Sequence, residues 1–126
     1  MNINYIKKIS LVLIIYRSEK IINKFIKKIP KQLQTIIIEN SNNRKLKKEI
    51  EKKYKHIKVY IKKNNGVASS LNYAAKKIKT EYFIHISPDI KFDFRGLDKF
   101  HNIAKEKKDN FSALGPRFTN VNKKSH

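Results

Sequence analysis

The chain has 126 residues, no cysteine and a formal net charge of +20 at pH 7. This length suits one domain with a single core, and the missing cysteine excludes disulfide scaffolds, thiol nucleophiles and cysteine-ligated zinc. The charge alone suggests a polyanion partner, but the 26 lysines scatter along the chain and only four residues are arginine, which suits bidentate contacts to phosphate or guanine. We therefore expect a globular domain that does not bind nucleic acid and is only weakly attracted to anionic lipid headgroups.

The chain begins with a strand pattern that is followed by a helix pattern. A nearly continuous apolar, β-branched run at residues 9–16 is typical of a strand buried on both faces. The run has no signal-peptide cleavage site after it and is far shorter than the roughly 20 apolar residues that cross a bilayer. Ser18 then offers an N-cap, and Pro30 closes the helix. The apolar residues at helical spacing between them are Ile21, Ile22, Phe25, Ile26 and Ile29.

Three more strand patterns follow, each with a helix pattern after it. Strands are predicted at residues 35–39, 57–61 and 82–86, and the second of these alternates more and is expected nearer an edge of the sheet. The apolar stripes of the helices are Leu46, Ile50 and Tyr54, then Val67, Leu71, Ala74, Ala75 and Ile78, then Leu97, Phe100, Ile103 and Ala104. Residues 111–118 are predicted to begin a fifth strand before a polar tail at residues 119–126.

Four alternations of strand and helix with short connections predict an α/β fold. Right-handed crossovers then give a mostly parallel sheet with helices on both faces, and ligands bind such sheets at the carboxyl ends of the strands. The segments after the four predicted strands read YRSE, ENSNN, NNG and SPD, and they hold many of the chain's polar and acidic residues. We therefore expect four loops to converge on one ligand-binding edge.

Two of these loops carry residues that could contact a nucleotide, and each has a purely structural alternative. Glu39 either holds a ribose or base, as acids do at this place in many nucleotide-binding folds, or caps its own loop. The segment Asn64-Asn65-Gly66 either leads into a helix whose free N–H groups face a diphosphate or forms only a turn. The glycine-free first loop excludes the dinucleotide-binding fingerprint, and no Walker-type loop occurs.

The fourth loop carries an aspartate directly after a proline. Pro88 ends the strand pairing and fixes the backbone before Asp89. The carboxylate can bind Mg²⁺ or Mn²⁺ together with phosphate oxygens of a substrate, or it can cap a turn. A metal here would neutralise a diphosphate that no glycine-rich loop holds.

In this order and spacing, ISLVLIIYRSE, TIIIENSNN, KKNNGVASSLNYAAKKIKTEYFIHISPDI and ALGPRF resemble the N-terminal part of family 2 glycosyltransferases of the GT-A fold. The similarity covers residues 9–118. Its most specific part runs from Asn65 and Gly66 through Asn72 to Pro88 and Asp89. The pattern looks most like rhamnosyltransferase-like members from bacteria, whose strand ends in Asn-Pro-Asp.

The resemblance implies a nucleotide-sugar site built from the predicted loops. Tyr16 and Arg17 would border the nucleotide, and Glu39 would contact the base or ribose. Asp89 would bind a divalent cation, Mg²⁺ or Mn²⁺, as the last position of the family's Asp-x-Asp motif. That cation stabilises the departing diphosphate while the sugar is transferred with inversion. The residues that would lie around the sugar diphosphate are Asn65, Gly66, Asn72 and Ser87.

Three positions depart from the pattern of that family. Arg17 stands where asparagine is usual, Glu39 where aspartate is usual, and Ser87 replaces the first acid or asparagine of the metal motif. The loss of an acid at Ser87 weakens metal binding unless phosphate and water supply the missing oxygens. The resemblance further implies a UDP- or dTDP-linked donor, a glycan or lipid-linked acceptor, a role in cell-surface polysaccharide synthesis, and a cytoplasmic location, peripheral on the inner face of the plasma membrane.

The sequence offers no general base for this reaction. Asp93 and Asp98 are the nearest spare carboxylates, and we expect both on the surface. In the family, the acceptor site and the base come from a second half, so we expect residues 1–126 to be a single donor-binding domain, with residues 119–126 leading to a missing C-terminal half. The alternative is a non-catalytic basic module of the same fold that binds anionic membrane or nucleic acid.

Overall fold

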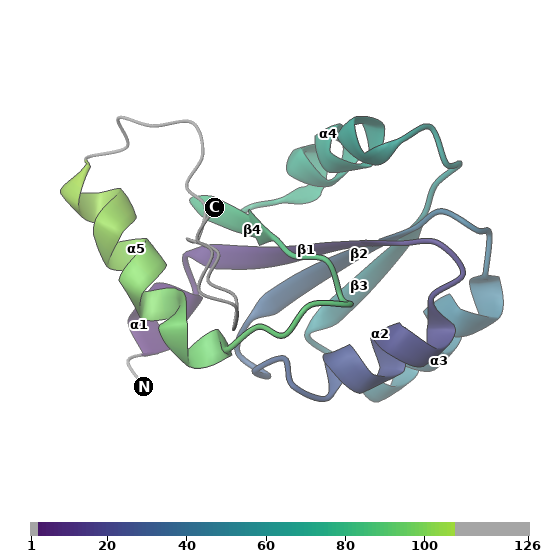
Figure 1. Ribbon diagram of the computed structural model, residues 1–126, viewed down its shortest axis with the longest axis horizontal. Helices are drawn as coiled ribbons and strands as arrows, with labels where there is room; N and C mark the ends of the chain where they lie inside the picture. The colour runs from purple at the N-terminus through teal and green to yellow at the C-terminus, as the bar shows by residue number, and fades with distance from the viewer. Residues whose placement is uncertain (1–2, 108–126) are drawn as a thin grey trace, which may run out of the picture.

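The computed structural model describes residues 3–107, which are organised around one four-stranded sheet (Figure 1). The strands are β1 (Ile9–Ile15), β2 (Gln34–Glu39), β3 (Ile57–Ile61) and β4 (Tyr82–His85). They lie in the order β3-β2-β1-β4, and every neighbouring pair is parallel. The expected parallel α/β architecture is therefore confirmed, whereas the expected fifth strand at residues 111–118 and the tail at 119–126 lie outside the described residues.

Helices cover both faces of the sheet. Helices α2 (Glu19–Ile26) and α3 (Arg44–Lys53) lie on one face, and α4 (Val67–Lys77) lies on the other (Figure 1). At the end of the sheet where β1 begins, α1 (Ile3–Ile6) packs beside α5 (Leu97–Glu106), which follows the short η1 (Phe94–Gly96). The sequence did not indicate α1, because four residues are too few to show a hydrophobic period. Among the described residues, no helix has the length and apolar character needed to cross a membrane.

The strands β1 and β2 are buried on both faces, as their apolar runs predict. Successive strand residues point to opposite faces, so Leu13 and its neighbour Ile37 enter the larger core with α2 and α3. Val12 and Ile38 enter a smaller core on the opposite face, which Ala74 of α4 completes. The sheet thus forms the middle layer between helices.

Two helices bury only part of their predicted apolar stripes, with Ala74 of α4 and with Leu97 and Ala104 of α5 in the core. On α4, Val67 is 56% exposed and Ala75 is also exposed, whereas Ser70 and Ala74 are fully buried. Small side chains let a helix approach a sheet closely, and the Ser70 hydroxyl finds a polar partner there. On α5, Ile103 is 41% exposed. The sequence correctly predicted both helices, but packing determines which face of each helix is buried: α4 packs against the sheet, and α5 packs against α1 and η1.

The helix α2 ends before the proline that was expected to close it. Its last residue is Ile26, and the next N–H groups, those of Lys28 and Ile29, bond to the carbonyls of Phe25 and Ile26. These bonds span three residues instead of four, so the helix tightens into turns before Pro30.

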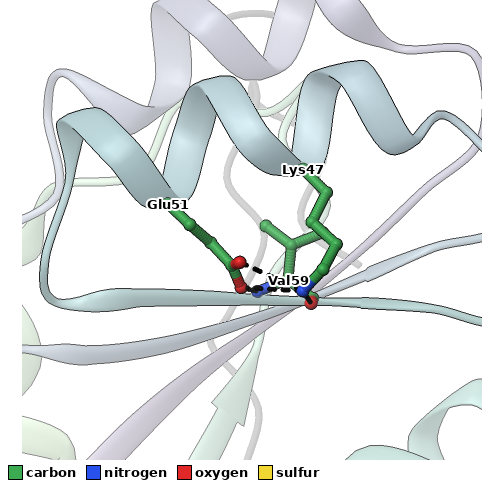
Figure 2. Close-up of polar contacts among 3 residues, drawn as sticks. All are labelled: Lys47, Glu51 and Val59. Atoms are coloured by element: carbon green, nitrogen blue, oxygen red, sulfur yellow. Dashed lines mark hydrogen bonds and ion pairs between the residues drawn. The ribbon is translucent and has the colours of Figure 1, made fainter.

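The strand β3 forms one edge of the sheet, as its alternating pattern predicts. The His56 carbonyl accepts the N–H of Thr35 in β2. The backbone N–H and C=O groups of the even-numbered residues therefore point toward β2, whereas those of Val59 point away from the sheet. Glu51 of α3 accepts the Val59 N–H at 2.8 Å, and the Lys47 ammonium donates to the Val59 carbonyl at 2.7 Å (Figure 2). The two side chains also pair with each other at 3.0 Å. Both outward polar groups of Val59 are thereby satisfied within the chain.

Candidate functional site

A cleft of about 680 Å³ opens beside the carboxyl ends of β1, β2 and β3. This is the edge at which a parallel α/β sheet binds ligands, and three of the four expected loops meet there. The lining residues, in chain order, are Tyr16, Arg17, Asn40, Ser41, Asn42, Ile61, Lys62, Lys63 and Asn64. The loop after β4 contributes none of these residues.

The loop after β1 places Tyr16 and Arg17 in the cleft wall, as expected. Tyr16 is 48% exposed, and the Arg17 guanidinium lies 5.1 Å from the centroid of its ring, within the range of a cation–π contact. Ser18 precedes α2 at the N-cap position, but its side chain makes no capping bond. Its hydroxyl donates instead to the Tyr16 carbonyl at 2.9 Å. Ser18 therefore stabilises the loop and not the helix.

Two residues of the cleft have a left-handed backbone conformation, which is unfavourable for Arg17. Arg17 has φ of +51° and Asn42 has φ of +58°, and they are the non-glycine residues with positive φ in the described part of the chain. Asparagine tolerates this region, whereas other side chains pay roughly 1–2 kcal/mol for it. Such strain is typically held at functional sites. Asparagine, which the resemblance gives as the usual residue at the place of Arg17, would tolerate this left-handed backbone.

Glu39 lies behind the cleft wall and uses its carboxylate within its own loop. It is 1% exposed. One oxygen accepts the Ser41 N–H at 2.9 Å and the Ser41 hydroxyl, and the other accepts the Asn43 N–H at 2.7 Å. Asn43 in turn caps α3 by accepting the Leu46 N–H at 3.0 Å. In this structure Glu39 therefore shapes the wall through Ser41 and is not itself a lining residue.

The loop after β3 places two lysines and an asparagine in the cleft. The Lys62 ammonium donates to the Ser69 hydroxyl of α4 at 2.8 Å, and Asn64 accepts the Gly66 N–H at 3.3 Å. Gly66 has φ of +96°, so any other residue would be strained at this start of α4. The loop is thus held at both of its ends.

Three sequence-predicted residues of this region lie outside the cleft lining. Asn65 and Gly66 are exposed at the start of α4, next to the lining residue Asn64. Asn72 is exposed further along the same helix. The structure thus brings Tyr16 and Arg17 together in the cleft, whereas Asn65, Gly66 and Asn72 are not lining residues.

Ser87 and Asp89 lie together in the loop after β4. The Ser87 hydroxyl donates to the Asp89 carboxylate at 2.5 Å, and the Ser87 carbonyl accepts the Ile90 N–H at 3.3 Å in a turn. Both side chains are exposed. Residues 3–107 contain no group of three histidine, cysteine or acidic side chains that could hold a metal. One carboxylate and one hydroxyl fit only a cation whose remaining ligands are phosphate oxygens and waters.

The structure adds residues to the site that sequence reasoning missed. Asn40 is buried, and its amide donates to the Ser70 hydroxyl of α4 at 3.1 Å. This pair connects the end of β2 to α4 and so positions the two sides of the cleft. Lys62 and Lys63 also line it, but in a chain with 26 lysines no local signal distinguished these two.

The family comparison covers this whole arrangement. Residues 10–125 match the model of glycosyl transferase family 2, a span that includes nearly all of β1, the other three strands and every loop of the cleft. A search of curated proteins found no match. The match confirms the resemblance seen in the strand-end motifs, and the chain belongs to glycosyl transferase family 2.

Proposed function

We propose that the cleft binds a nucleoside-diphosphate sugar and that this chain is the donor-binding domain of a glycosyltransferase. The observation that carries the proposal is the position of the cleft at the carboxyl ends of three parallel strands. Family membership supplies the reaction class, transfer of a glycosyl group. The proposal therefore assigns the sugar donor of this reaction to the cleft.

The chemistry of the lining supports a nucleotide, and the family resemblance makes UDP or dTDP its proposed form. The exposed ring of Tyr16 offers a flat surface on which a base can stack. Ser41 and Asn42 bring a hydroxyl and an amide that can bond to the base or ribose. Lys62 and Lys63 bring positive charge for the phosphates. Glu39 then acts through Ser41, by fixing the wall against which the nucleoside rests.

A divalent cation, Mg²⁺ or Mn²⁺, is proposed at Asp89 with help from the Ser87 hydroxyl. When bound, such a cation supplies charge stabilisation for the departing diphosphate. The close contact between Ser87 and Asp89 keeps both oxygens on one side of the turn. Asn65, Gly66 and Asn72 remain proposed contacts of the sugar diphosphate: Asn65 and Gly66 directly follow the lining residue Asn64, and Asn72 is exposed on α4.

No general base is assigned among the described residues. Asp93 and Asp98 are both exposed, as expected. Hydrogen bonds from the Arg95 side chain hold the pKa of Asp93 below its usual range, which makes it a weaker base, and its side chain caps η1. We propose that the base and the acceptor site come from residues other than these.

The finer features of the reaction follow the family resemblance. We propose inverting transfer of a rhamnosyl or other hexosyl group to a glycan or lipid-linked acceptor, in cell-surface polysaccharide synthesis on the cytoplasmic side of the plasma membrane. The net charge of +20 would favour electrostatic attraction to the anionic lipid headgroups of that membrane.

The test is calorimetric titration of the full chain with UDP-glucose, dTDP-rhamnose, UDP and dTDP, with and without Mn²⁺. We expect saturable binding that Tyr16→Ala weakens and Tyr16→Phe retains, because phenylalanine keeps the stacking surface. Absence of binding by all four compounds, or equal affinity of Tyr16→Ala, would refute the proposal. The alternative basic module predicts binding to heparin or anionic vesicles that falls steeply with salt and ignores the nucleoside.

A further inference from the structure

The charge of the cleft lining is of one sign. Its charged members are Arg17, Lys62 and Lys63, and no acidic residue lines it. Glu39, the acid predicted for this place, is buried behind the wall, and both of its oxygens accept hydrogen bonds from the loop. Three cations around one opening favour an anionic ligand, because an anion relieves their mutual repulsion.

Two of these cations are held in place before any ligand arrives. The Lys62 N–H continues the sheet by bonding to the Glu39 carbonyl at 3.0 Å, and its ammonium is bound by the Ser69 hydroxyl at 2.8 Å. The Arg17 N–H donates to the Ser41 hydroxyl at 3.3 Å, and its guanidinium rests over Tyr16. A ligand therefore meets charges that are already partly ordered, which lowers the entropy lost on binding.

The acid that could hold a metal is separate from these charges. Asp89 is not a lining residue, and the other carboxylate of the loop after β4, Asp93, is paired with Arg95. Its oxygen already accepts a hydrogen bond from Ser87. The positive charge that the structure places in the cleft thus comes from side chains.

We propose that Lys62, Lys63 and Arg17 bind the diphosphate directly, so that a nucleoside diphosphate enters the cleft without a divalent cation. This inference rests on the proposed function for the identity of the ligand as a nucleotide. A cation at Asp89 then adds to binding or to transfer but is not required for the nucleoside diphosphate to bind. Lysine ammonium groups suit this task as compact charges with three donors each.

The test is titration of the full chain with UDP and with uridine in the presence of EDTA. We expect wild type to bind UDP under these conditions, and Lys62→Met with Lys63→Met to lose about tenfold or more in UDP affinity, as charge-assisted hydrogen bonds are removed. Uridine affinity should not change. Methionine keeps the length of the apolar stem, and Lys63→Met alone leaves the bond between Lys62 and Ser69 intact in case the double variant folds poorly.

A matched control removes the same charge elsewhere. Lys7 and Lys8 are exposed and precede β1, at the opposite end of the sheet from the cleft. Lys7→Met with Lys8→Met should leave UDP affinity within about twofold, because charges this far apart are largely screened at physiological salt. An equal loss in this control would show that the net charge, and not the cleft, attracts UDP.

The outcomes separate this inference from the proposed function. Binding of UDP that needs Mn²⁺, disappears in Asp89→Asn and is unchanged in Lys63→Met would overturn the inference and leave nucleotide binding standing. Failure of UDP, dTDP and both sugar nucleotides to bind, with and without Mn²⁺, would overturn the proposed function and this inference together.

Discussion

Lys47 and Glu51, one turn apart on α3, bind the two outward backbone groups of Val59 and pair with each other (Figure 2). Sheet edges with free N–H and C=O groups are templates for pairing with another chain. In β3 the side chains of α3 take the place of that next strand at Val59. The contact is therefore expected to affect both stability and association.

We expect Glu51→Ala to lower the free energy of unfolding by about 1–2 kcal/mol, because the Val59 N–H loses a charged acceptor. We also expect more self-association through the freed edge. Urea denaturation measures the first effect and sedimentation velocity the second. Glu49→Ala is the matched control, since Glu49 is an exposed acid on the same helix. Equal behaviour of the two variants would contradict a role for Glu51 at the edge.

The same contact predicts a dependence of stability on pH. Burial raises the pKa of Glu51, but hydrogen bonds from Val59 and Lys47 outweigh it, and the pKa lies below the ordinary value of 4.5. A lowered folded-state pKa stabilises the fold above pH 4.5, and this contribution is lost as the pH falls through the folded-state pKa. The difference in unfolding free energy between wild type and Glu51→Gln should therefore shrink below pH 4.5. A difference that stays constant in denaturation curves down to about pH 3 would contradict this account.

Arg17 is expected to reduce the stability of the fold. Its φ of +51° is unfavourable for arginine and tolerated by asparagine. Arg17→Asn should therefore raise the free energy of unfolding by about 1 kcal/mol, while UDP affinity falls because a cation leaves the cleft. Arg17→Lys keeps both the charge and the strain, so its stability should match wild type. Thermal denaturation measures the stability of both variants, and titration with UDP measures their affinity. A gain of stability in Arg17→Lys would contradict backbone strain as the cause.

The neighbouring serines of α4 should have different effects. Ser70 is fully buried and bonds to buried Asn40, so Ser70→Ala should cost about 1–3 kcal/mol by leaving the amide without its partner. Ser69 instead binds the Lys62 ammonium at the cleft. Ser69→Ala should change stability little and weaken UDP binding. Urea denaturation and titration with UDP measure the two effects in both variants. An equal loss of stability in Ser69→Ala and Ser70→Ala would contradict the separate roles of the two serines.

Much of the fold was predictable from the sequence because it depends on local patterns. Apolar runs and helical stripes of residues determine which segments are strands and helices, and their alternation determines a parallel sheet with a ligand site at one edge. Tyr16 and Arg17 could be assigned to that edge because they directly follow β1. The family pattern in the same loops is equally a property of the sequence.

Other features were decided only by the tertiary structure, because they depend on which groups meet across the fold. From the sequence Glu39 could either contact a ligand or cap its own loop, and the structure shows N–H groups of that loop bound to its carboxylate. The face of α4 that is buried depends on Ser70 meeting Asn40. Lys62 and Lys63 differ from the other lysines only because the end of β3 lies beside the loops after β1 and β2. The sequence by itself determined where a site would form, and packing decided which charges line it.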